Sequence, residues 1–585
     1  MKILVMILLA SCSLAQQTAP RSSPQPSADT AFRKLADQYF DEVYFRFNPT
    51  QGTAAGFHQY DTHFEDLSAQ AIGAQIGALH RFRALFDQVD PGRLSPEAQA
   101  DRDLLISNIL GTLLSLEKIR AWEKNPDIYS SSTAASAFTI MSRKYAPPDE
   151  RLKSLTEREE KMPAMLDEAR KNLKNPPRIY TEVALEQIPG IIGFFQKDVP
   201  EAFTAAKDPA IKQAFNKANS QLIAALQKYG EYLKNEGLPH SHGVFKIGAD
   251  NYRQKLLYDE MVDTPLDRLL DIGTADLRKN QEEFKRVAAE IDASKTPRQI
   301  LDQLERDHPA PNQLLQSFRD TFSGLRGFIE QKRIITIPSP VLPILEETPP
   351  FERALTTASM DTPGPFEAVA KEAYFNVTLP EANWPKEHVE DYMSGFNRGT
   401  IISTAVHETY PGHYVQFLWM KDAPSKVRKL LGSGTNAEGW AHYCEQMMLD
   451  EGYGQPGRGA RDEREAKMLR LGQLQDALLR NARFIVGIKM HTEQMSFDEA
   501  KEFFVKEGYQ VHSVAEKEAK RGTSDPTYLV YTLGKLQIMK LREDYKRMKG
   551  DQFSLEEFHN AFMRQGFPPI KIVRRALLGN DSPTL

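Results

Sequence analysis

The residues best suited to chemistry lie in the segment HETYPGH, residues 407–413. Many zinc peptidases place two histidines at positions i and i+4 of one helix to bind the metal, with a glutamate beside them as general base. Here His407 and His413 are six positions apart. On a regular helix their rings would therefore point about 120° away from each other.

Pro411 and Gly412 change that expectation. A proline inside a helix leaves the carbonyl of His407 without its donor and kinks or widens the turn, and a glycine adds backbone freedom. We therefore expect a distorted turn that brings both imidazoles to one point. The alternative is a helix end that carries two unrelated histidines.

A second motif, EGWAHYCE, occupies residues 438–445. Glu438, His442 and Glu445 stand at i, i+4 and i+7, so they share one face of a helix. We predict that Glu438 is the third metal ligand and that His442 and Glu445 orient the ligand imidazoles. His442 could also be a ligand itself. The alternative is that Thr435 and Glu438 form a capping box, but it leaves His442 and Glu445 on an otherwise apolar helix unexplained.

The two segments together resemble the bacterial domain-of-unknown-function 885 family. That family is similar to zincin-type zinc metallopeptidases of the thimet oligopeptidase and Taq carboxypeptidase kind. The resemblance covers most of the mature chain. Three weaker motifs support it: an opening motif in residues 48–61, a middle motif with Gly248 and Tyr252, and a closing helix in residues 525–535. One departure is the run 487–491, where only His491 of the family's usual pattern remains, and we assign that run no function.

The resemblance implies an enzyme that hydrolyses amide bonds with one Zn²⁺ per chain. His407, His413 and Glu438 would hold the metal, and Glu408 would be the general base. Late tyrosines in the similar peptidases stabilise the oxyanion, so Tyr531 is the first choice for this role and Tyr528 the second. Each tyrosine could equally be a core aromatic.

The substrate is expected to be a peptide or a small amide. The segment 375–379, with Asn376, could be an edge strand that pairs with an extended peptide. An enzyme that trims carboxyl termini also needs a cation, and the sequence does not choose among Arg521, Lys535, Arg480 and Arg483. Two other functions remain open: a zinc amidohydrolase acting on a non-peptide amide, and a non-catalytic exported binding protein whose closed metal site would need His442 as fourth ligand.

The elements that position these residues are predicted to be mainly helical. One clear helical window runs from Thr264 to Ile291, and the other long windows are roughly 31–47, 95–123, 149–174, 209–235, 297–331, 462–490 and 526–548. We expect a large, two-lobed, zincin-like fold with a small β element beside the active-site helix. Residues 31–585 would form a single catalytic domain, with an N-terminal lobe to about 240, a connecting region and a catalytic C-terminal lobe from about 335. Strands are expected at 333–337 and 374–379, and residues 336–350 form a proline-rich extended connection.

The first 15 residues are typical of an export signal, because a lysine precedes an apolar run too short to span a bilayer. Residues 9–12 resemble a lipoprotein signal that would leave a lipid anchor on Cys12, and residues 13–15 resemble an ordinary cleavage site. Residues 16–30 read as a flexible linker. The protein is thus expected to be periplasmic or lipid-anchored, with no other membrane contact. A net charge of −5 gives no reason to expect a nucleic-acid partner.

Overall fold

The computed structural model describes residues 27–353, 356–492 and 494–585. The predicted signal sequence and Cys12 lie outside these residues. Helix α1 (Ala28–Tyr39) begins with the Ser27 hydroxyl accepting the backbone N–H of Thr30, so the predicted linker is wrong in its last three residues. Within the described ranges, no helix is both long and apolar enough to cross a membrane.

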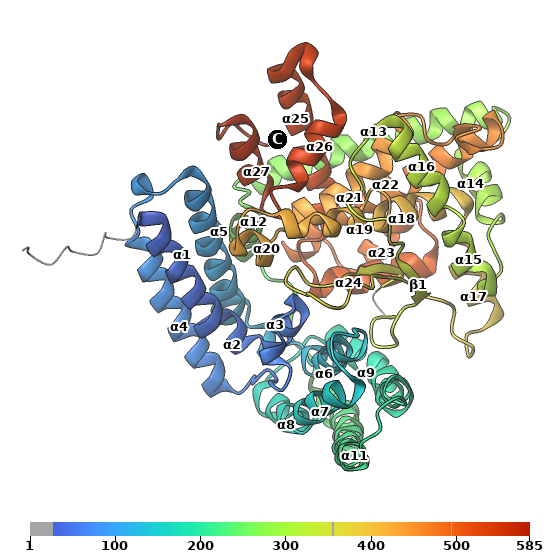
Figure 1. Ribbon diagram of the computed structural model, residues 1–585. Helices are drawn as coiled ribbons and strands as arrows, with labels where there is room; N and C mark the ends of the chain where they lie inside the picture. Colours follow the sequence, from blue (N-terminus) through green and yellow to red (C-terminus); the bar gives the residue numbers. More distant parts are fainter. Residues whose placement is uncertain (1–26, 354–355, 493) are drawn as a thin grey trace, which may run out of the picture.

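The helices of the N-terminal part, coloured blue to green in Figure 1, form two separate hydrophobic cores. Helices of the first core are α1, α4 (Ala69–Asp87) and α5 (Pro96–Leu113). Helices of the second core are α6 (Asp127–Met141), α7 (Pro148–Glu159), α8 (Met162–Asn172), α9 (Arg178–Gly193) and α11 (Pro209–Tyr232). The N-terminal part of the chain is therefore built from two groups of helices.

The C-terminal part is a bundle of long helices that surrounds the two motifs. Its main helices are α13 (Leu266–Ile291), α18 (Arg398–Glu408), α21 (Gly434–Asp450), α22 (Glu463–His491) and α25 (Val530–Lys549). Helix α13 lies in the predicted connecting region, yet it packs along α22, where Phe284 and Ile485 share a core. The fold is mainly α-helical, as predicted, with a small sheet beside α18.

That sheet has three short strands in the order β1-β3-β2. Strand β3 (Tyr374–Val377) lies in the middle, parallel to β1 (Ile344–Glu347) and antiparallel to β2 (Ala358–Asp361). The predicted strand at 374–379 is thus present, and β1 forms inside the proline-rich segment. The predicted strand at 333–337 is wrong, because Arg333 ends α16 (Phe322–Lys332) in a left-handed conformation and its neighbours pack into the core as a loop.

Two glycines let α21 and α25 touch backbone to backbone. A Cβ atom on Gly439 would lie 2.5 Å from the Cα of Gly534, and a Cβ on Gly534 would lie 2.0 Å from the carbonyl oxygen of Thr435. Only glycine allows so close an approach. Helix α25 therefore packs directly against α21, the helix that carries Glu438. This contact places Tyr531, one turn before Gly534, near Glu438.

Candidate metal centre

The segment 407–413 is not one helix but two helix ends joined by a tight loop. Helix α18 ends at Glu408, and α19 (His413–Leu418) begins at His413. Between them the N–H of Gly412 donates to the carbonyl of Val406 at 3.0 Å. A Cβ atom on Gly412 would lie only 1.7 Å from the carbonyl oxygen of His407, so this loop requires glycine. The distortion predicted from Pro411 and Gly412 is present as a complete break.

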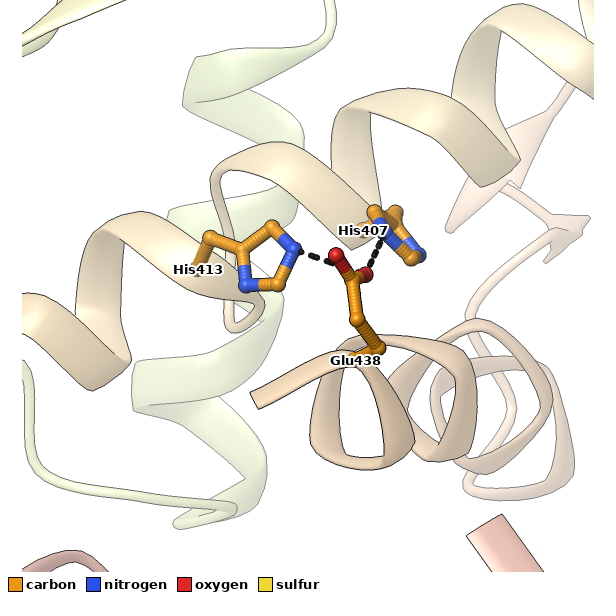
Figure 2. Close-up of side chains that lie close together, drawn as sticks. All are labelled: His407, His413 and Glu438. Atoms are coloured by element: carbon orange, nitrogen blue, oxygen red, sulfur yellow. Dashed lines mark ion pairs between the residues drawn. The ribbon is translucent and has the colours of Figure 1, made fainter. Parts of the chain in front are cut away.

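The break brings three side chains together (Figure 2). The Nε2 atoms of His407 and His413 each lie 3.3 Å from Oε2 of Glu438. One donor atom from each residue lies within 4.8 Å of the others. Donors at zinc bond lengths of about 2.0–2.1 Å in a tetrahedron lie about 3.3 Å apart, so this set fits a zinc ion. Both imidazoles, separated by six positions in the sequence, do meet at one point.

A distant carboxylate, Glu260, holds the start of the helix that carries Glu438. Glu260 is the last residue of α12 (Ala249–Glu260), and its oxygens accept the N–H groups of Gly434 and Thr435 at 3.0 and 2.8 Å and the Thr435 hydroxyl at 2.6 Å. Burial raises the pKa of Glu260 to about 7. The capping-box alternative is therefore wrong, and the Glu438 carboxylate is free to face the histidines.

Glu445 contacts the imidazole of His407 at Nδ1, the ring nitrogen that does not face Glu438. Its Oε1 lies 2.7 Å from Nδ1 of His407 and 3.2 Å from the guanidinium of Arg480, and its Oε2 lies 3.0 Å from Nδ1 of His442. Because Nδ1 of His407 donates to a carboxylate, its Nε2 presents a lone pair to the metal position. This geometry suits the orienting role predicted for Glu445. His442 reaches the centre only through Glu445, and burial lowers its pKa to about 4.

Glu408 lies beside the three ligands on the wall of a cavity of about 460 Å³. It is 6% exposed, and its Oε2 has no hydrogen-bond partner among the described side chains. Burial raises the pKa of Glu408, which favours a group that accepts a proton near neutral pH. The same cavity is lined by His407, His413 and Glu438, so one side of the metal position faces open space.

The chain was compared with protein families, curated proteins and solved structures. A family model described as a bacterial protein of unknown function, DUF885, matches residues 49–577. The chain belongs to the DUF885 family. None of the curated proteins matches it.

Two solved structures share the fold of this DUF885 chain. One is described as a candidate lipoprotein of unknown function from Shewanella oneidensis; it is 26% identical over 94% of this chain and 99% of its own, with a TM-score of 0.75. The other, a candidate lipoprotein from Colwellia psychrerythraea, is 15% identical over 94% and 98%, with a TM-score of 0.78.

The structure separates the two tyrosines proposed for the oxyanion. Tyr531 lines the cavity, its ring is stacked 6.1 Å from that of His407, and its hydroxyl accepts a hydrogen bond from Arg521 at 3.1 Å. Tyr528 belongs to the same hydrophobic core but is fully buried and does not line the cavity; a Cβ on Gly522 would lie 2.3 Å from its hydroxyl. Tyr531 is thus the tyrosine that this DUF885 site brings to the metal position.

Asn376 does not lie on an edge strand, so the edge-strand prediction for residues 375–379 is wrong, and its role in substrate binding stays a prediction. It lies on the middle strand β3, is 2% exposed and donates to the Ser359 hydroxyl at 3.4 Å. Strand β2 is one of the two edge strands of the sheet, and its residues Ala358, Ser359 and Met360 line the metal cavity. The edge strand expected beside the site therefore exists, but it is β2.

Each of the four cations suggested for a terminal carboxylate has a carboxylate of the protein as a partner, and Arg521 pairs with Asp525 at 3.2 Å. Lys535 is 1% exposed and lies 3.4 Å from Asp276, Arg480 pairs with Glu445, and Arg483 forms two bonds to Glu518 at 2.6 and 2.7 Å. Lys535 therefore does not line the cavity, and its role in substrate binding stays a prediction. Arg521 is the member of this set that lines the cavity.

Proposed function

We propose that this protein is an exported zinc-dependent hydrolase, and specifically a peptidase that cleaves short peptides. The observation that carries the proposal is the convergence of His407, His413 and Glu438 on one point, with Glu408 beside them on a cavity wall. Two histidines and a glutamate form a catalytic zinc set when one position stays open. The finer likeness to two-lobed zincin peptidases belongs to the same proposal.

The chain's own residues supply the rest of the reaction. A zinc ion held by the three ligands would act as a Lewis acid and lower the pKa of water towards about 7. Glu408 takes a proton from the attacking water and passes it to the leaving nitrogen. The hydroxyl of Tyr531 donates to the developing oxyanion, and Glu445 keeps His407 in the tautomer that can bind a metal.

Strand β2 offers the backbone that an extended peptide needs. Its inner edge pairs with β3, and no described strand pairs with its other edge. Main-chain hydrogen bonds to such an edge bind a peptide with little regard to its sequence. Arg521, on the same cavity, would receive the terminal carboxylate of a peptide cut near its end.

A closed structural metal site is the less favoured alternative. Such a site needs a fourth protein ligand, and the sequence offers His442 for it. In the structure His442 is not part of the ligand cluster, and Glu445 lies between its ring and His407. This arrangement favours an open, catalytic centre.

Export and a lipid anchor on Cys12 are part of the proposal. They are supported by the signal-like N-terminus and by the description of both structural neighbours as candidate lipoproteins.

The substitution Glu408→Gln tests the proposed mechanism. The variant should keep about one zinc per chain, because Glu408 is not a ligand, and should lose peptide turnover by about 10²–10⁴-fold. Zinc content by elemental analysis and kcat on a peptide library are the measurements. Unchanged turnover in a zinc-loaded variant would exclude Glu408 as the base, and absence of peptide cleavage by the zinc-loaded wild type would exclude a peptidase.

A further inference from the structure

The opening motif, which the proposed reaction does not use, lies against the loop that follows β2. The motif ends α3 (Pro49–Ala55) at Gly56, which has a φ of +98°. The N–H of Phe366 donates to the carbonyl of Ala55 at 3.0 Å. The ring of Phe57 stacks on that of Phe366 at 4.7 Å. The end of α3 and the residues that follow it thus contact the loop after β2 through both backbone and side chains.

Side-chain bonds reinforce this contact. Nε2 of His58 lies 2.9 Å from Oε2 of Glu367, and Nδ1 of His58 lies 3.1 Å from Asp61. The imidazole is stacked on Tyr145 with 3.7 Å between ring centres. A Cβ atom on Gly364 would lie 2.0 Å from the carbonyl oxygen of Ala54, so the loop touches the backbone of α3 directly.

A second contact involves the two ends of the connection between the antiparallel strands β2 and β3. Arg143, just after α6, donates to Asp361 at 2.5 Å and to the carbonyl of Glu372 at 2.6 Å. The hydroxyl of Tyr374 donates to the carbonyl of Ser142 at 3.1 Å. Asp361 is the last residue of β2 and Tyr374 the first of β3, so both ends of the connection are fixed by one arginine and its neighbour.

We propose that residues 55–58 and Arg143 form a positioning element that fixes the edge strand β2 along the wall of the metal cavity. Strand β2 contacts both places: its residues 358–360 line the metal cavity, and its last residue, Asp361, lines a second cavity together with residues of α3 and α6. The N-terminal part thereby sets where an extended substrate lies relative to Glu408. This effect on substrate position rests on the proposed peptidase activity. The contacts that fix β2 to the N-terminal part do not depend on that activity.

The test compares two variants at the contact with one matched control in the full-length, zinc-loaded protein. His58→Ala removes the imidazole, and Glu367→Gln keeps the size of the side chain but replaces the oxygen that faces His58. The control is His80→Ala, because Nε2 of His80 also lies 2.9 Å from a glutamate, Glu117, within the N-terminal helices and away from β2. Hydrogen–deuterium exchange of residues 358–367 and zinc content are measured for all three.

We expect both contact variants to exchange about tenfold faster in residues 358–367 at unchanged zinc content, because a lost charged hydrogen bond lowers the local opening free energy. The control should match the wild type there. Unchanged exchange in both contact variants would overturn the proposal, and so would a uniform increase along the whole chain, which reports general destabilisation.

Kinetics then separate this inference from the proposed function. With an active wild type, the contact variants should raise KM about tenfold and leave kcat within about twofold, since uniform binding is lost and the reacting groups are untouched. A fall in kcat at constant KM would contradict the positioning role. If the wild type cleaves no peptide, the proposed function fails while the exchange experiment still decides whether β2 is held by the N-terminal part.

Discussion

At the scale of residues, the charged side chains around the candidate metal centre differ in the residues that they contact, and these contacts indicate their roles. Glu438 faces the histidines because Glu260 holds the start of its helix. Arg480 neutralises Glu445 inside the protein instead of binding substrate. Arg521 remains the cation at the cavity, where it also donates to Tyr531.

Arg521→Met should weaken cleavage of peptides that carry a free terminal carboxylate. A charge-assisted hydrogen bond contributes about 1.5–3 kcal/mol, so kcat/KM should fall about 10- to 100-fold. The same peptides with an amidated C-terminus are the internal control, because they lack the charge that Arg521 would bind. An equal loss on both substrates would show that Arg521 acts through Tyr531 and not on the carboxylate.

The residue scale also shows what the sequence could and could not predict. The types and spacing of His407, His413 and Glu438 were sufficient to predict that these three side chains converge, because Pro411 and Gly412 predicted a distorted turn between the histidines. Glu260 could not be found, since it lies far away in the sequence and carries no local motif. The buried pair of Lys535 and Asp276 could not be predicted either, because nothing in the sequence shows that these two residues are neighbours.

At the scale of elements, backbone contacts at small residues decide which helices lie next to the site. The crossing of α21 and α25 at Gly439 and Gly534 places Tyr531 over His407. Helices were predictable from apolar periodicity, whereas strand order was not. Strand β2 has four half-buried residues, ASMD, without a clear alternation of polar and apolar side chains. The sequence therefore did not show that β2 is an edge strand and that β3, predicted as the edge strand, lies in the middle.

Gly534→Ala should destabilise the protein and disturb the site. An added methyl group in a tightly packed contact costs about 1–3 kcal/mol, so the midpoint of thermal unfolding should fall and kcat should drop with it as Tyr531 moves. Gly327→Ala on the exposed face of α16 is the control, since a Cβ there meets nothing within 4 Å. That control should be neutral or more stable by up to about 1 kcal/mol. Equal unfolding midpoints for both variants would argue against the close crossing.

At the scale of the whole molecule, binding of a metal would be linked to folding, because the candidate ligands come from three separate helices. Burial opposes a charge on His407, but its bonds to Glu438 and Glu445 outweigh burial and raise its pKa to about 9. The charged imidazole therefore stabilises the metal-free protein below its unfolded pKa of about 6.5. That contribution is lost as the pH rises through about 9.

Zinc should raise the unfolding temperature more strongly as the pH increases from 6 to 8. A metal must displace the proton of His407, so its apparent affinity and the resulting stabilisation grow with pH. Thermal unfolding with zinc and with a chelator measures the difference at each pH. His407→Ala should show little difference at any pH, and a pH-independent difference in the wild type would contradict the coupling.

The most direct test of the metal centre is X-ray absorption spectroscopy at the zinc edge of the purified, zinc-loaded protein. We expect about one zinc per chain, coordinated by two imidazole nitrogens, one carboxylate oxygen and a further oxygen from solvent at about 2.0–2.2 Å. His413→Ala and Glu438→Ala should each remove one of these ligands. A spectrum with four protein ligands, or one that neither substitution alters, would contradict the assignment.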